Sequence, residues 1–288
     1  MGIFGWRMRE EFLALWRYRD VTRNYVSSML RVRYRRSFLG YLWTMMAPMI
    51  NYLIIGFALY HLRGGGDNPD ASWFLGFMLT GSVYFGFLSH CIVESATVLI
   101  GNEHFIRRLS LPKSIYVLNM LCYNVVNFLL VFAGLMLLNL AVWGAQNLRH
   151  ALFAGPGDEP PAALWIIPGV HALFVPVAIA VAMVGLWGIT QIIAVLTIYF
   201  RDLTHILPPI MQAAFFATPI FFHPDRYHYL IRWLNPFYHY VQLFRAPIIE
   251  HRLPDFYQAL CCVGFSILLF FAGTWFLRRM SNKIIFKM

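Results

Sequence analysis

Charged residues are scarce in this sequence, and their scarcity decides the class of protein. Only 12% of the 288 residues are Asp, Glu, Lys or Arg, whereas 59% are hydrophobic. Soluble globular proteins have about 25% charged residues, and half of that number cannot cover a soluble surface of this size. The composition therefore argues against a soluble α-helical enzyme and indicates an integral membrane protein.

Motifs for nucleotide and metal chemistry are also missing. The sequence has no G-x-x-x-x-G-K-[ST] loop, no H-E-x-x-H pair and no paired carboxylates at working spacing. His223, His228 and His239 lie in an aromatic interfacial segment and form a poor candidate metal site. The four cysteines lie in apolar runs, which predicts packing roles rather than disulfides. We expect no catalytic residues, no metal site and no cofactor in this chain.

Long apolar runs are abundant instead. A membrane-spanning helix needs about 20 apolar residues, and six stretches are long enough, although the fourth has room for two short passes. Pro168 and Pro176 near its start can kink it. We predict an all-α polytopic membrane protein with six transmembrane helices, at about 40–61, 73–100, 114–143, 164–200, 203–222 and 255–277.

The distribution of basic residues selects a single pass for the fourth stretch. Cytoplasmic loops are enriched in Lys and Arg. With six spans, seventeen of the 23 Lys and Arg residues fall on one side and six on the other. Seven spans would move Arg201 and the four C-terminal basic residues to the sparse side. We therefore expect both termini in the cytoplasm, with segments 1–39, 40–278 (the transmembrane domain) and 279–288 (a basic tail).

The basic charge is not spread evenly, so it does not suggest nucleic-acid binding; it is densest before the first span. Polar residues from Asp20 to Arg31 recur at helical spacing beside an apolar face. This pattern predicts an amphipathic helix in the membrane surface. Its arginines either orient the protein only or also dock a cytoplasmic partner. The apolar face is Val21, Tyr25, Met29 and Val32, and the arginines are Arg23, Arg31, Arg33, Arg35 and Arg36.

Ionisable residues are few inside the spans, which argues against a proton relay. A charge at the bilayer centre costs at least about 2.5–3.5 kcal/mol on insertion scales. Glu94 lies towards the cytoplasmic end of the second span. It is expected to pair with a neighbouring span or a basic residue, with substrate contact as the alternative.

Aromatic residues make up 17% of the chain. Interface belts and helix packing account for many of them. Aromatic rings also offer flat apolar faces that suit sugar rings, so an aromatic channel for a glycan is a second interpretation. The candidate channel residues are Trp43, Tyr52, Tyr60, Trp73, Tyr84 and Phe85.

The connections at the two ends of the spans have different patterns. GNEHFIRRLSLPKS, from Gly101 to Ser114, predicts a short charged helix with Asn102 as its cap. Exposed Phe105 and Ile106 would enter a groove on another protein, unless the segment is a solvated loop. In the last outer loop, Asn235 predicts a helix start before Pro236. We expect two short amphipathic helices around Asn235 that dip towards the membrane and cover a pore.

Four stretches together resemble the membrane subunit of ABC-2 type polysaccharide exporters, which move O-antigen, teichoic acid or capsule chains. The resemblance covers nearly the whole chain from about residue 20, and it is specific as a set although each stretch alone is weak. The last of them, through FRAPII, favours the O-antigen branch. The stretches are VRYRRSFLGYLWTMMAPM (32–49), NEHFIRRLSLPKS (102–114), IYFRDLTHILPPIMQAAFFATPIFF (198–222) and LNPFYHYVQLFRAPII (234–249).

The resemblance implies a homodimer in the bacterial inner membrane that binds two copies of a separate ATPase subunit, which holds ATP and Mg. The dimer would enclose a channel for a lipid-linked glycan, and residues 12–36 would form an interface helix among membrane lipids. A coupling helix would comprise Asn102, Glu103, His104, Phe105, Arg107 and Arg108, and outer gate helices at 225–250 would carry Trp233, Phe237, Tyr240 and Phe244.

Two other functions stay open. A membrane enzyme of lipid-linked sugar metabolism would need a pair of catalytic acidic residues near the membrane face, and none is found. An ABC-2 exporter of capsule, teichoic acid, a drug or a small lipid is the second alternative. The Pro- and Gly-rich loop at 154–163 is given no role.

Overall fold

The computed structural model describes residues 16–33, 42–62, 70–109, 111–153, 166, 169–221 and 234–287, and these residues form helices and turns without any strand. The chain is therefore an all-helical polytopic membrane protein, as the sequence predicted. The elements are α2 (Arg19–Arg33), α3 (Leu42–Leu62), α4 (Asp70–Val98), η2 (Ile100–Asn102), α5 (Glu103–Arg108), α6 (Ser114–Phe153), η3 (Val170–Phe174), α7 (Val175–Tyr199), α8 (Leu203–Ala217), α10 (Pro236–Ile249) and α11 (Phe256–Lys287).

Four segments are long and apolar enough to cross a membrane: Phe74–Val98, Ser114–Phe153, Val170–Tyr199 and Phe256–Ser281. The other two predicted spans correspond to α3 and α8. Helix α3 has 21 residues, and Met49–Ala58 is the apolar stretch found among its described residues. With 15 residues, α8 measures about 22 Å at 1.5 Å per residue, less than the roughly 30 Å of a bilayer core. The structure thus has four candidate spans among the described residues, and six passes stay a prediction.

The stretch that had room for two passes contains one long helix. The 3-10 turn η3 leads directly into α7, and Pro176 lies in the first turn of α7. A proline there does not break the helix, because the first N–H groups of a helix have no intrahelical acceptor. Residues 170–199 therefore make a single pass.

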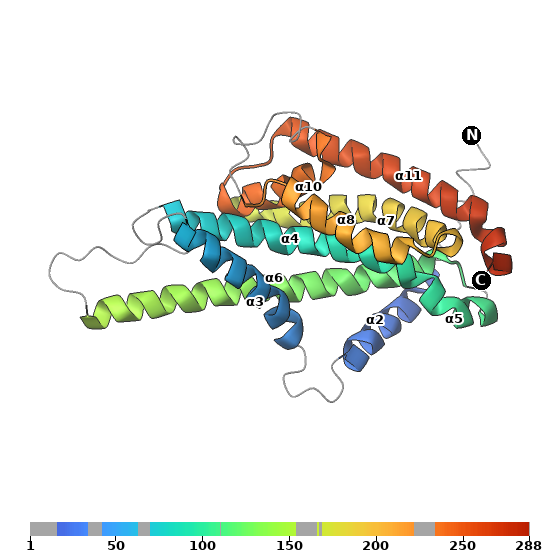
Figure 1. The fold of residues 1–288 in the computed structure, drawn as a ribbon, viewed down its shortest axis with the longest axis horizontal. Coiled ribbons are helices and arrows are strands. Elements are labelled where there is room, and N and C mark those ends of the chain that lie inside the picture. The colour runs from blue at the N-terminus through green and yellow to red at the C-terminus, as the bar shows by residue number, and fades with distance from the viewer. Residues whose placement is uncertain are drawn as a thin grey trace.

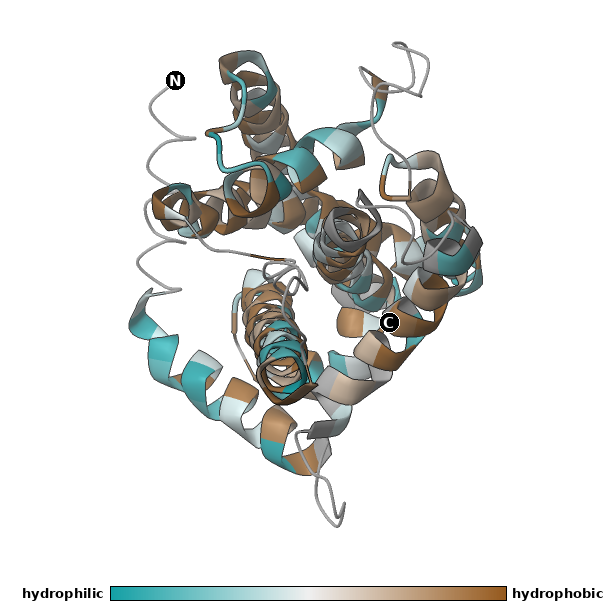
Figure 2. Cartoon of the chain, turned by 90° about the vertical axis from the view of Figure 1, so that its left-hand side faces the viewer, coloured by the Kyte–Doolittle hydropathy of each residue, from teal (hydrophilic) through white to brown (hydrophobic). Residues whose placement is uncertain are grey.

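Helix α4 is the centre of the bundle, because it packs against α3, α6, α7, α8 and α10. Most of the bundle consists of apolar residues (Figure 2). The closest helix pair is α7 and α11. A Cβ atom added to Gly188 would lie 1.9 Å from the backbone oxygen of Leu269, and one added to Gly273 would lie 2.1 Å from the oxygen of Gly188. Glycine at both positions lets the two backbones touch, as is common between membrane helices.

Two helices are longer than the spans predicted for them. At 40 residues, α6 measures about 60 Å, twice the thickness of a bilayer core. Helix α11 continues to Lys287, so most of the predicted basic tail is helical. The Lys113 ammonium group donates to the backbone oxygen of Ser281 and, at 2.9 Å, to its hydroxyl oxygen. This contact ties the start of α6 to the end of α11, and burial lowers the pKa of Lys113.

The short helices lie at opposite ends of the bundle. Helices α2 and α5 lie at the same end as the C-terminal end of α11, while α10 lies near the other end (Figure 1). There α10 packs against η3, α4, α7 and α11. The two ends are called the α5 end and the α10 end below.

Candidate functional site

The predicted coupling segment forms a short helix with an exposed surface. Helix α5 spans Glu103–Arg108, and the Arg107 guanidinium pairs with the Glu103 carboxylate at 2.8 Å, one turn away. Phe105 is 51% exposed and its ring contacts His104 edge-on, while Arg108 is also exposed. The segment is therefore a helix, as predicted, rather than a plain solvated loop.

One residue of this helix differs from its predicted placement. Ile106 was expected to be exposed beside Phe105, but its side chain is only 8% exposed and belongs to the main core. Successive residues of a helix point about 100° apart, so neighbouring apolar side chains cannot share a face. Ile106 anchors α5 to the bundle, and Phe105 is the apolar side chain that stays outside.

A polar junction joins α5 to α2, α4 and α6. Asn102 lies at the N-cap position of α5 without capping it, because its side-chain amide donates to the backbone oxygen of Val98 at 2.7 Å. Asn102 also hydrogen-bonds Tyr25 of α2, whose pKa is raised by burial. Glu94 of α4 accepts a 2.7 Å hydrogen bond from Asn124 of α6. Glu94 therefore pairs with a neighbouring span, one of its two expected roles.

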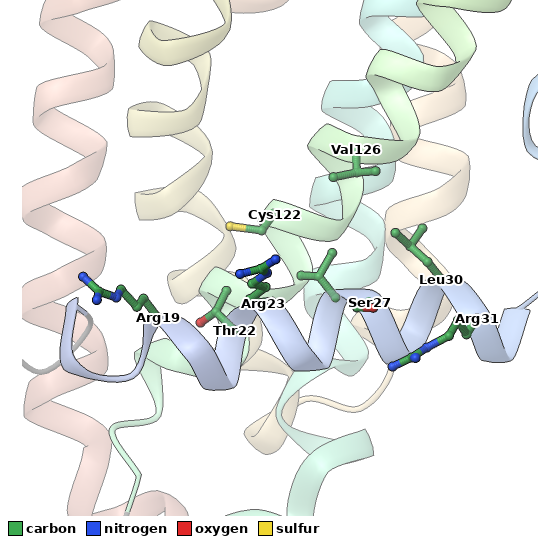
Figure 3. A pocket seen from close by; sticks show the side chains of 9 residues that line it. Arg19, Thr22, Arg23, Ser27, Leu30, Arg31, Cys122 and Val126 are labelled. Carbon is green, nitrogen blue, oxygen red and sulfur yellow. The ribbon is translucent and has the colours of Figure 1, made fainter.

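Helix α2 packs on α6 through residues beside its predicted apolar face, and that face stays mostly exposed. Val21, Met29 and Val32 are exposed, at 40%, 41% and 62%. The side chains turned to α6 belong to Thr22, Arg23, Ser27 and Leu30, around Cys122 and Val126 of α6 (Figure 3). Arg23 and Arg31 both line this contact with α6, and both side chains remain exposed at the surface. Arg33 is the last residue of α2, and its side chain lies outside the described part of the structure. Arg35 and Arg36 also lie outside it.

A pocket of about 440 Å³ between α3, α4 and α8 has a mixed polar and apolar wall. Its polar side chains come from all three helices, and amide and imidazole groups in apolar spans need partners or water. Sequence reasoning missed most of them, although an amide inside an apolar run is a usable signal. The polar residues are Asn51, Ser89, His90 and Gln212, and Phe85 and Phe215 line the pocket beside them.

The candidate channel aromatics do not form one group. Phe85 lines the α3–α4–α8 pocket, and Trp43 is 47% exposed on α3. Tyr84 is fully buried in the core, where it stacks on Phe244 at 4.3 Å and donates to the backbone oxygen of Ala178 at 3.2 Å. Tyr84 therefore packs helices in this structure instead of facing a channel. The side chains of Tyr52, Tyr60 and Trp73 lie outside the described residues.

The described part of the predicted outer gate region is α10, and its residues from Tyr238 to Ile249 are all buried. Asn235 caps it as predicted, accepting from the backbone N–H groups of Phe237 and Tyr238. Phe244 inserts between Tyr84 of α4 and Phe128 of α6. The Tyr240 hydroxyl lies 2.6 Å from the Ser266 hydroxyl of α11. Phe237 contacts Phe85 at 5.4 Å. Trp233 and the helix expected before Asn235 fall outside the described residues.

The polar face of α10 is buried too, which the sequence did not indicate. Arg245 has no exposed surface; its guanidinium donates to the Pro219 oxygen at 3.1 Å and to Gln242 at 2.7 Å. It also lies 3.5 Å above the ring of Phe77. Gln242 donates to Glu250, which pairs with Arg252. Burial lowers the pKa of Arg245 to about 10, so the side chain stays charged at neutral pH.

Comparison with known families matches residues 23–249 of this chain to the ABC-2 type transporter family. The chain belongs to that family. The matched region begins in α2 and ends at the last residue of α10, so it contains α5, the polar junction and the α3–α4–α8 pocket. The resemblance found in the sequence is confirmed.

Three O-antigen export permease proteins are similar to the chain along most of their length. The chain is 24% identical over 265 residues to the O-antigen export system permease protein RfbA of Myxococcus xanthus, which covers 90% of this chain and 92% of the relative. It is 22% and 24% identical to two proteins of the same name from Klebsiella pneumoniae, over 71% of this chain and 70% of each relative. ABC-2 membership and these spans make the chain a multi-pass transport subunit rather than an enzyme.

Proposed function

We propose that this chain is the permease subunit of an ATP-driven exporter that moves a lipid-linked O-antigen polysaccharide out of the cytoplasm. One relative that is similar over 90% of the chain and two that are similar over 71% carry O-antigen export names. The permease would be a homodimer in the bacterial inner membrane, with six spans per subunit and both termini cytoplasmic. Two ATPase subunits would supply ATP and Mg, and this chain would need no cofactor of its own.

The exposed surface of α5 is the observation that carries the proposal. Phe105, Arg107 and Arg108 face outward, whereas Ile106 fixes the helix to the core. A partner that binds this surface can push on the bundle without unfolding α5. The polar junction at Asn102 continues the contact to α2, and Glu94 joins α4 to α6.

Transport then follows from a shift between two states of the dimer. ATP binding can move the permease only if the ATPase contacts α5 differently in the two states. The α3–α4–α8 pocket is a candidate part of the glycan path, because His90, Asn51 and Gln212 are exposed in otherwise apolar helices. A second copy of the chain on this face would enclose these groups, and sugar hydroxyls would satisfy them. Phe85 adds an apolar ring for stacking.

Copurification from native membranes tests this proposal. The tagged chain is expected to bring down an ATPase subunit in stoichiometric amount, with ATP hydrolysis in the eluate. Reversal of charge at Glu103, Arg107 and Arg108 should remove that subunit while leaving the permease folded. A strain that lacks this chain should accumulate lipid-linked glycan on the cytoplasmic side of its inner membrane.

The same experiment separates the alternatives. Absence of an ATPase in both mild detergent and nanodiscs would contradict an ABC permease and favour the membrane enzyme. If an ATPase copurifies but the strain without this chain accumulates no O-antigen intermediate, the chain is still an ABC permease. Its cargo would then be capsule, teichoic acid, or a small lipid or drug. His90→Asp or His90→Leu tests the proposed glycan path separately from the ATPase contact. In these variants transport should fall while the ATPase stays bound.

A further inference from the structure

A groove of about 460 Å³ lies between α2 and α6 at the α5 end. Helix α2 crosses this end of the bundle, and α6 rises from it (Figure 3). Arg23 lies in the middle of the groove, directly beside Cys122. The proposed transport path at α3, α4 and α8 shares no lining residue with it.

The polar groups in this groove are all suited to an anion. The Arg23 guanidinium presents several N–H donors and has no ion-pair partner among the described residues. The Thr22 hydroxyl oxygen is buried and makes no hydrogen bond in the described part of the chain. Ser27 adds a second hydroxyl, and no carboxylate lines the groove. A phosphate accepts hydrogen bonds from all three side chains.

The apolar part of the groove wall extends from α2 along α6. Val26 and Leu30 of α2 and Cys122 and Val126 of α6 form the apolar lining, and Arg19 and Arg31 of α2 add two more basic side chains. Cys122 and Val126 are one helical turn apart on the same face, and Val126 lies farther from α2 than Cys122 does (Figure 3). The donors therefore lie at the end of the bundle, while the apolar wall leads along the span towards the membrane interior.

We propose that the α2–α6 groove binds an anionic phospholipid, with the phosphate at Arg23, Thr22 and Ser27 and an acyl chain along Cys122 and Val126. The charge of a phosphodiester complements the unpaired guanidinium, and an acyl chain covers apolar surface that the protein leaves open. A lipid in this position would hold α2 against α6, next to the junction between Tyr25 and Asn102. The assignment concerns a resident lipid and does not depend on the cargo.

Lipid titration followed by native mass spectrometry of the full-length chain tests this site. Phosphatidylglycerol is expected to bind more tightly than zwitterionic phosphatidylcholine. Arg23→Gln should weaken phosphatidylglycerol binding about tenfold, the size expected for a lost charge-assisted hydrogen bond. Thr22→Val, which keeps the side-chain shape, should weaken it less. Arg201→Gln is the matched control, because Arg201 is an exposed arginine outside the groove, and its affinity should equal that of the wild type.

Photocrosslinking locates the bound lipid. Phosphatidylglycerol with a diazirine in its acyl chain should label the peptide with Cys122 and Val126 in the wild type, and label it much less in Arg23→Gln. Equal phosphatidylglycerol affinity in wild type and Arg23→Gln, or labelling elsewhere only, would overturn the proposal. Displacement of the lipid by millimolar inorganic phosphate, or binding of polyprenyl diphosphate but not phosphatidylglycerol, would contradict the phospholipid as occupant.

Discussion

Helices α5 and α10 both carry arginine, and they use it in opposite ways. In α5, Arg107 and Arg108 are exposed, and the partner of Arg107 is Glu103 of the same short helix. In α10, Arg245 is fully buried, and its guanidinium reaches the backbone of Pro219 and the side chain of Gln242. The two ends of one bundle thus present the same residue type to the surface and to the core.

The difference shows which end leaves its charges available at the surface and which end uses its charge in packing. Exposed ion pairs contribute little to stability, so the charges of α5 are free to serve recognition. A buried charge is costly unless it is fully paired, so Arg245 restricts α10 to a position where its acceptors are present. Movement of α10, if a gate opens there, must carry Pro219 and Gln242 along or replace them.

Removal of Arg245 should have the largest effect. Arg245→Met keeps much of the side-chain volume but leaves two buried acceptors unpaired, each costing about 1–3 kcal/mol. We expect the stability of the detergent-solubilised protein to fall by about 3 kcal/mol, measured as a thermal shift. Arg252→Gln is the control, because the pairs of Arg252 are partly exposed, and its loss should stay below about 1 kcal/mol. Equal losses in the two variants would contradict the proposed role of Arg245.

The second prediction compares the stability effects of two glycine substitutions, one beside α10 and one beside α5. A Cβ atom at Gly185 would lie 2.5 Å from the Tyr240 hydroxyl, whereas one at Gly101 meets nothing within 4 Å. Gly185→Ala should displace Tyr240 and destabilise the protein by about 1–3 kcal/mol, the usual cost of overpacking. Gly101→Ala should be neutral or stabilising by about 0.4–1 kcal/mol, because it restricts the unfolded chain. Similar melting temperatures for the two variants would show that α10 packs loosely.

The junction at the α5 end should give a smaller effect on stability. Tyr25→Phe removes the hydroxyl that bonds Asn102 but keeps the ring, so we expect a loss of about 1 kcal/mol. Its clearer readout is coupling: the variant should bind the ATPase subunit yet transport less glycan per ATP hydrolysed. Met29→Ala, an exposed position on α2, is the control. An unchanged ratio of glycan transported to ATP hydrolysed in Tyr25→Phe would show that the contact between α2 and Asn102 takes no part in coupling.

Exchange of the charges within α5 should affect stability least. A double variant, Glu103→Arg with Arg107→Glu, keeps an ion pair one turn apart, and such pairs are worth only about 0.2–0.5 kcal/mol. Melting should therefore be unchanged within that range, while ATPase copurification is lost. Retention of the ATPase by the double variant would show that the partner does not read these charges, and Phe105→Ala would then test the apolar contact.

Sequence patterns predicted the positions of the helices better than the contacts that the helices make. Hydropathy located the four candidate spans, because a membrane helix must be apolar over a known length, and the distribution of Lys and Arg predicted a single pass for the fourth stretch. Asn235 predicted the start of α10 from local capping chemistry. The apolar face predicted for α2 stays mostly exposed. The sequence did not indicate which α2 residues pack on α6, because that contact depends on where α6 lies.

By itself, the sequence determined the membrane class, the helical fold, the ABC-2 resemblance and the short charged helix α5, since composition, length and local motifs carry this information. Tertiary structure alone decided that Ile106 anchors α5, that Tyr84 lies in the core, and that the Arg245 side chain of α10 is fully buried. It also brought Arg23, Thr22 and Cys122 into one groove. Burial and pairing depend on which helices meet, and residues distant in the chain supply the acceptors and walls that no local pattern contains.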